Sequence, residues 1–247
     1  MDVLADIRDH YNFTLENLGL VKFDNKSKVD QTTVALYASI IGLADAIRTL
    51  YKNVSTIGFG PLFRSLMEAY VDLILITDDK DYIYRMEASD LEAEIKLFRI
   101  AEKGDNAYVA DLTAKPDLEN VRQSKEDRLA YLKGQKLGAF TVADCFIKAG
   151  MESEYRTLYN YASSESHNNI GALVERHIRI YHEDSDLVMV LNKSNKGGEY
   201  DHHITTTSSI LLRSGIRMHE KYETDSSKVF HERYEVFHEN QKAHFSK

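Results

Sequence analysis

Residues 61–77 read PLFRSLMEAYVDLILIT, in which apolar residues recur at helical spacing and proline stands only at the start. Proline suits the first turn of a helix because the N–H group that it lacks has no partner there. The pattern predicts one helix from Pro61 to about Thr77, preceded by a break at residues 55–60. The helix is apolar on several sides, which is typical of a helix inside a bundle.

Helical spacing continues through most of the chain. The expected helices cover about residues 7–18, 30–51, 61–77, 81–103, 118–132, 141–149, 152–167, 202–223 and 226–245. Glycine and proline number only 12 and 2 among 247 residues, which is about half of average usage. This composition argues against sandwiches and barrels, because their many turns need these residues.

The pattern changes to strict alternation from His177 to His182, and Leu187–Leu191 is a second run rich in β-forming residues. We therefore expect a mainly α fold, a multi-helix bundle with one small β-hairpin near residues 177–192. Residues 1–225 are expected to form the bundle domain. Residues 226–247 are expected to form a C-terminal helix that contacts a second copy of the chain.

Charge and cysteine content limit the partners, the metal sites and the cellular location that the sequence favours. Lys and Arg number 31 against 39 Asp and Glu, so the net charge of −8 gives no general attraction to nucleic acid. Any contact with RNA needs a local basic patch. Cys145 is the single cysteine, so an internal disulfide and a cysteine-rich zinc site are both excluded. The N-terminus lacks the pattern of a signal peptide, and the most apolar run, Leu73–Ile76, is far too short to cross a bilayer. We expect a soluble, cytoplasmic protein without membrane contact.

Motifs for cofactors and metals are weak. The sequence has no phosphate-binding glycine loop, nucleophile elbow or dinucleotide fingerprint. Glu235-x-x-His238 has the spacing of di-metal bundles, but those sites need the motif twice and two further glutamates. The His202-His203 pair at a helix start is interpreted as surface or capping histidines. We expect no cofactor and no metal.

Two pairs of polar residues carry the candidate chemistry. Arg64 and Glu68 lie four residues apart on one helix, and Ser163 and His167 have the same spacing on another. A guanidinium binds phosphate through two parallel hydrogen bonds, and histidine titrates near neutral pH. If the two helices abut, we expect a catalytic cluster in which Arg64 binds a phosphate and His167 acts as general acid or base. Glu68 would orient either of them, and Ser163 would position the substrate.

Structural explanations account for the same residues. Arg64 and Glu68 can form a buried ion pair that holds helices together. The serines can end their helix while His167 donates to a backbone carbonyl. A non-catalytic regulatory or sensor module with a buried network is the alternative to an enzyme. A third reading is a small-ligand site lined by some of the 15 tyrosines, although tyrosines on apolar stripes usually belong to the core.

Arg64-x-x-x-Glu68 within an apolar run, followed about a hundred residues later by Tyr159, Ser163-x-x-x-His167 and a β-like stretch, resembles an uncharacterised bacterial family, domain of unknown function 5677. The resemblance spans roughly residues 30 to 220. It implies a mainly helical fold and no settled activity. Such proteins are similar in helical architecture to HEPN domains, many of which are metal-independent ribonucleases of toxin and phage-defence systems. The resemblance thus implies RNA as a partner. A homo-oligomer is expected from the aromatic residues of the last helix, Phe230, Tyr234, Phe237 and Phe245.

The HEPN signature is an arginine, a polar residue and a histidine a few residues later. Arg176 and His182 fit that spacing. The alternating pattern from Ile178 places the two on one strand, about 20 Å apart if it is fully extended. The match is therefore interpreted as coincidence, and Arg64, Glu68, Ser163 and His167 remain the candidate site.

Overall fold

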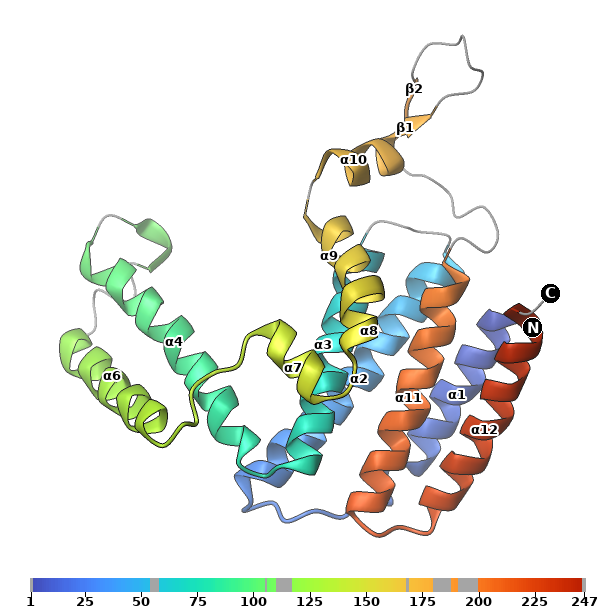
Figure 1. Ribbon diagram of the computed structural model, residues 1–247, viewed down its shortest axis with the longest axis horizontal. Coiled ribbons are helices and arrows are strands. Elements are labelled where there is room, and N and C mark those ends of the chain that lie inside the picture. The colour runs from blue at the N-terminus through green and yellow to red at the C-terminus, as the bar shows by residue number, and fades with distance from the viewer. Residues whose placement is uncertain are drawn as a thin grey trace. The chain divides into compact units, whose positions relative to one another are not determined.

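The computed structural model in Figure 1 describes residues 2–53, 58–104, 106–109, 117–167, 169–179, 188–190 and 200–245. The predicted fold class is confirmed: the chain is mainly helical, with one pair of short strands. Contacts divide it into two compact units, one formed by Met1–Thr77 with Phe146–Lys247 and the other by Asp78–Cys145.

The larger unit is a helical bundle. Its elements are α1 (Val3–Leu18), α2 (Lys28–Lys52), α3 (Phe59–Asp78), α8 (Glu152–Glu154), the π-helical turn η2 (Tyr155–Tyr159), α9 (Asn160–Ser166), α10 (Ile170–His177), α11 (Asp201–Lys221) and α12 (Ser226–Phe245). Helix α11 packs against α1, α2 and α12. The core also takes most of α3, in which Phe63, Leu66 and Met67 are fully buried. The expectation that residues 61–77 form an inner helix is thus confirmed, although the helix begins two residues earlier, at Phe59.

Helix α12 packs against α11 at Gly215, a position that requires glycine. A Cβ atom on Gly215 would lie 2.1 Å from the Phe230 ring, far inside van der Waals contact. Phe230 and Phe237 are both buried, in a cluster with Leu212 and Ile216. These two aromatic residues of the last helix therefore face the core of their own chain. A contact of α12 with a second copy stays a prediction.

Strands β1 (Ile178–Arg179) and β2 (Val188–Met189) form an antiparallel pair in which Ile178 lies opposite Met189. They lie within the range where the sequence predicts a hairpin. Residues 180–187, which join them, are outside the described residues, as are residues 191–199.

Helix α2 is, within the part of the chain that the structure describes, the helix that is long and apolar enough to cross a membrane, with a mean hydropathy of 1.4 over its most apolar window. Its side chains Tyr37, Ile40 and Ile47 are fully buried inside the chain. The core helix of a soluble bundle has the same length and composition. The absence of membrane contact stays a prediction.

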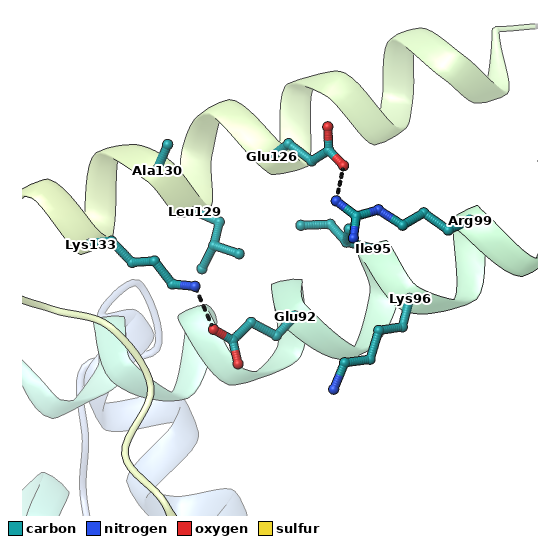
Figure 2. A pocket seen from close by; sticks show the side chains of 8 residues that line it. All are labelled: Glu92, Ile95, Lys96, Arg99, Glu126, Leu129, Ala130 and Lys133. Atoms are coloured by element: carbon teal, nitrogen blue, oxygen red, sulfur yellow. Dashed lines mark hydrogen bonds and ion pairs between the residues drawn. The ribbon is translucent and has the colours of Figure 1, made fainter.

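The smaller unit contains α4 (Tyr82–Glu102), η1 (Ala107–Val109), α6 (Leu118–Gly134) and the start of α7 (Val142–Lys148). Helices α4 and α6 pack around a small apolar seam that includes Leu91, Ile95 and Leu132. Figure 2 shows the groove beside this seam, where two ion pairs join the helices. Five pairs cross between α4 and α6: Arg99–Glu126, Arg122–Glu102, Lys125–Glu94, Arg128–Glu87 and Lys133–Glu92. The sequence of α4, in which charged and apolar residues alternate at helical spacing, thus matches a helix pair with a small apolar contact and charged margins.

Candidate functional site

Helix α3 presents Arg64 and Glu68 on one face, one turn apart. The Nε atom of Arg64 donates a hydrogen bond to Oε1 of Glu68 over 3.0 Å. Their side chains keep 29% and 36% of their surface exposed. The ion pair considered from the sequence is therefore present, but it is partly exposed rather than buried. The apolar neighbours on α3 point into the core, whereas these two polar residues lie at its margin.

Tyr159 approaches the same carboxylate from another part of the chain. Its hydroxyl donates to Oε1 of Glu68 over 2.6 Å, and its ring centroid lies 5.3 Å from Cζ of Arg64. Glu68 Oε1 thus accepts from both the guanidinium and the phenol. Tyr159 holds Arg64 in two ways, through its ring and through the shared carboxylate.

The helix that carries Tyr159 is irregular. The sequence predicts one helix over residues 152–167, but the structure inserts the π turn η2 between α8 and α9. Turns of this kind are rare and occur frequently at functional sites. Tyr159 is the last residue of the turn, and its ring stacks on that of Tyr155 at 5.2 Å. No side-chain pattern marks such a turn, so it could not be predicted from the sequence.

His167 ends α9 and reaches back to α3. Its backbone N–H donates to the carbonyl of Ser163 over 3.1 Å, and its Nε2 atom lies 3.4 Å from Nη1 of Arg64. A guanidinium only donates hydrogen bonds, so the imidazole accepts in this contact and carries its proton on Nδ1. The histidine is exposed. The juxtaposition of guanidinium and imidazole predicted from the sequence is therefore present.

Ser163 is the member of the predicted set that makes no side-chain contact with the others. Its hydroxyl forms no hydrogen bond within the described part of the chain, and only its carbonyl contacts His167. Ser164 instead bonds Asn169, whose side chain caps α10 by accepting from Ala172 over 2.7 Å. The structure thus joins Arg64, Glu68, Tyr159 and His167, with Ser163 half-buried one turn before the histidine.

Charge states in the cluster follow from these contacts. The hydrogen bond from Arg64 to Glu68 raises the pKa of the guanidinium, which therefore stays charged. Burial raises the pKa of Tyr159, and its bond to Glu68 raises it further, so the phenol stays protonated at neutral pH. Because Glu68 occupies Nε of Arg64, the outer edge of the guanidinium is turned toward His167. The arrangement can hold an anion beside a proton-accepting imidazole.

Gly60 lets α9 approach α3 closely enough for these contacts. A Cβ atom there would lie 2.7 Å from Cβ of Glu165 and 3.1 Å from the carbonyl oxygen of Ala162. The sequence interpretation assigned Gly60 only to a chain break. Its place one turn before Arg64 was the available signal that another segment packs against this turn.

His203 lies in an aromatic enclosure beside the start of α3. Its ring centroid is 5.5 Å from Phe59, 4.8 Å from Phe63, 5.8 Å from Tyr161 and 5.4 Å from Tyr200. Only 6% of the residue is exposed, and neither ring nitrogen has a hydrogen-bond partner. Burial lowers the pKa of His203 to about 4, and the neighbouring His202 adds to this effect. The interpretation of this residue as a surface or capping histidine is wrong.

Two further expectations concern the Arg176–His182 spacing and the absence of metals. Arg176 lies in the last turn of α10, not on a strand, and its Nε donates to the Ala172 carbonyl over 3.1 Å. His182 lies outside the described residues. No group of three or more potential metal ligands occurs among the residues whose positions are described. The expected absence of metals and cofactors stays a prediction.

Comparison with curated proteins and with solved structures finds no match. One protein-family model matches residues 30–186, and it describes a family of unknown function. This match covers more than half of the chain and includes all four residues of the joined cluster. The chain therefore belongs to the family of unknown function DUF5677.

Proposed function

We propose that Arg64, Glu68, Tyr159 and His167 form the active site of a ribonuclease that needs no metal ion. The observation that carries the proposal is the 3.4 Å contact between Nη1 of Arg64 and Nε2 of His167 in two residues that are both accessible to solvent. An accessible cation beside an imidazole is suited to bind a phosphodiester and to move a proton at it.

The proposed reaction uses the 2′-hydroxyl of RNA as the nucleophile. A phosphate oxygen takes the place of Nε2 as the acceptor for Nη1 of Arg64. Nε2 of His167 then accepts the proton of the 2′-hydroxyl. The 2′-oxygen bonds to phosphorus, the bond to the 5′-oxygen breaks, and that oxygen takes a proton from water. The hydroxide left behind takes the proton from His167, which restores the neutral imidazole. The products are a 2′,3′-cyclic phosphate and a 5′-hydroxyl end.

The remaining groups have supporting roles. Glu68 and Tyr159 fix the guanidinium through Nε, so that its outer edge stays directed at the phosphate. The hydroxyl of Ser163, which has no hydrogen-bond partner among the described residues, is assigned to contact with the ribose. The likeness to HEPN ribonucleases, although it concerns only helical architecture, agrees with this chemistry. On that basis we assign the protein to a bacterial toxin or phage-defence system and expect a cytoplasmic homo-oligomer without membrane contact.

The test is cleavage of a short RNA by the purified full chain in the presence of EDTA. We expect products with cyclic phosphate ends, and no cleavage when the scissile nucleotide is 2′-deoxy. His167→Ala and Arg64→Ala should each reduce the rate by about 10²-fold or more. Arg156→Ala is the matched control, because Arg156 is an exposed arginine paired with Glu152 on the same helix segment. Equal rates for all variants, or no cleavage of any RNA by the wild type, would overturn the proposal.

A non-catalytic regulatory or sensor module is the second candidate. The hydrogen bond from Tyr159 to Glu68 favours it, because this bond ties η2 to α3 across 91 positions of sequence. In that case the cluster holds helices together and has no substrate. Loss of stability without any RNA cleavage would favour this function.

A further inference from the structure

A polar groove lies in the larger unit, apart from the Arg64–His167 cluster. It has a volume of about 350 Å³ and is bordered by α3, the α8–η2 segment, α11 and α12. Figure 1 shows these helices, among which α11 and α12 are also in contact. The volume falls at the lower end of the range for small-molecule sites, which suits a ligand of the size of one nucleotide.

The floor of the groove is apolar and the rim is polar. The floor includes Met67, Tyr70 and Leu158. The polar lining includes Arg213, His238 and Glu154. Such a division is typical of ligand sites, in which apolar contact supplies affinity and a few polar groups set the orientation. The ligand should therefore have a flat apolar part and a charged part.

Arg213 determines the charge of the ligand. Its Cζ atom lies 5.6 Å from the ring centroid of Tyr70, and no carboxylate among the described residues pairs with it. Its side chain is exposed, so the guanidinium donors are available to an anion. Phosphate is, with carboxylate, an anion that a guanidinium binds through two parallel hydrogen bonds.

Two other features select an aromatic, hydrogen-bonding partner. Tyr234 and His238 stack at 5.8 Å with an angle of 7° between their planes, which gives one wall of the groove a flat aromatic surface. Glu154 is the single carboxylate of the lining, and within the described chain it has no ion-pair partner. It can accept from an exocyclic amine or a ribose hydroxyl. A phosphate, a flat ring and hydroxyl or amine donors occur together in a nucleotide.

We propose that this groove binds a nucleoside 5′-phosphate, either as a free nucleotide or as one unit of an RNA strand. The second source rests on the proposed ribonuclease function, and the first does not. Leu158 of the floor and Tyr159 of the candidate active site are consecutive residues of the π turn, and Met67 and Glu68 are consecutive on α3. The same two segments therefore border both sites, which suits binding of a neighbouring nucleotide of one substrate.

The two methionines of the groove offer a direct readout. Met67 and Met151 line it, whereas Met86 lies on α4 in the other unit and serves as internal control. With methyl-labelled methionine in the full chain, 5′-AMP should shift the NMR signals of Met67 and Met151 and leave that of Met86 unchanged. Arg213→Ala should weaken binding about tenfold, with Arg213→Gln as a second variant that keeps a long polar side chain. Arg156→Ala should bind as the wild type does.

Two further ligands, a short RNA and inorganic phosphate, complete the experiment. A short RNA, added to His167→Ala protein so that it stays intact, should shift the same signals if the groove holds a unit of a strand. Shifts with AMP alone identify the free nucleotide as the ligand, and shifts with RNA alone identify the strand. Inorganic phosphate should bind more weakly and leave the methionines unshifted, and equal effects of phosphate and AMP would overturn the assignment to a nucleotide. No shift with AMP or RNA would overturn the proposal outright, whatever the outcome of the cleavage assay.

Discussion

Nη1 of Arg64 lies 3.4 Å from Nε2 of His167, although 103 positions of sequence separate the two residues. Glu68 and Tyr159 stand behind the guanidinium, and solvent reaches its side chain and the imidazole. A cation that is fixed at one edge and open at the other is suited to receive an anion. The geometry alone would also suit a site that only binds, so variants must separate the two roles.

Tyr159→Phe tests whether the phenol positions Arg64. The variant keeps the ring beneath the guanidinium and removes the donor to Glu68, so we expect RNA cleavage to fall about tenfold with a stability loss of only about 1 kcal/mol. The measurements are kcat/KM and the midpoint of urea unfolding. Tyr155→Phe is the control, since its hydroxyl has no partner in the described structure. An unchanged kcat/KM for Tyr159→Phe would contradict the positioning role.

Arg64→Ala tests how much the ion pair contributes to folding. Because both partners are about one third exposed, we expect its removal to lower the free energy of unfolding by no more than about 1 kcal/mol. Urea unfolding of the full chain gives this value. A loss of several kcal/mol would show that the pair is chiefly structural, and would favour the regulatory module over the enzyme.

Gly215→Ala tests the contact between α11 and α12. The new methyl group would overlap the Phe230 ring, so we expect destabilisation by about 1 to 3 kcal/mol. Gly42→Ala is the matched control, because Gly42 is also helical and a Cβ atom there meets open space. That variant should be stabilised by up to about 1 kcal/mol. Thermal unfolding of both would reveal the opposite signs, and equal shifts would speak against the close contact.

His203 makes stability depend on pH. Its folded-state pKa is lowered to about 4 by burial, whereas the unfolded value is about 6.5. Stability from the neutral ring is therefore complete above pH 6.5 and is lost as the pH falls from 6.5 toward 4. At pH 5 the expected loss from this residue is about 2 kcal/mol.

The corresponding measurement is urea unfolding at pH 7 and pH 5 for the wild type and for His203→Phe, which keeps an aromatic ring in the enclosure. The variant should lose about 2 kcal/mol less than the wild type between the two values. His10, which is also buried with its pKa lowered to about 4, should account for a further part of the loss in both proteins. His231→Gln is the control, because that histidine is exposed. Identical pH dependence of wild type and His203→Phe would refute the role of His203.

Local pattern was enough to predict most helices and both polar pairs, because helical spacing alone decides which residues share a face. The predicted helix at about residues 141–149 is present, and Thr141 and Asp144 cap its start through reciprocal bonds of 3.2 and 3.1 Å. The first helix shows the limit of this reasoning. Leu15, which follows Ile7 and Tyr11 at intervals of four residues and so shares their face, is exposed, whereas His10 and Thr14 are buried. The hydroxyl of Thr14 donates a hydrogen bond to the carbonyl of His10, and the His10 ring packs against that of Phe237. Hydropathy cannot anticipate such partners.

The candidate site was predictable in its residues but not in its assembly. Spacing showed that Arg64 could meet Glu68 and that Ser163 could share a face with His167. The meeting of the two helices depends on the small volume of Gly60 and on the π turn before Tyr159, both of which act through tertiary contact. Tyr159 was noted only as part of a family resemblance, since a lone tyrosine on an apolar stripe reads as core.

The π turn at residues 155–159 also sets the direction in which the side chains that follow it in the helix point. Deleting one residue there would restore regular α geometry and rotate α9 by about 100° around its axis. His167 would then swing away from Arg64 while every other helix kept its place. Relatives that preserve the arginine and histidine partnership should accordingly tolerate insertions and deletions in their loops but none between Glu152 and His167.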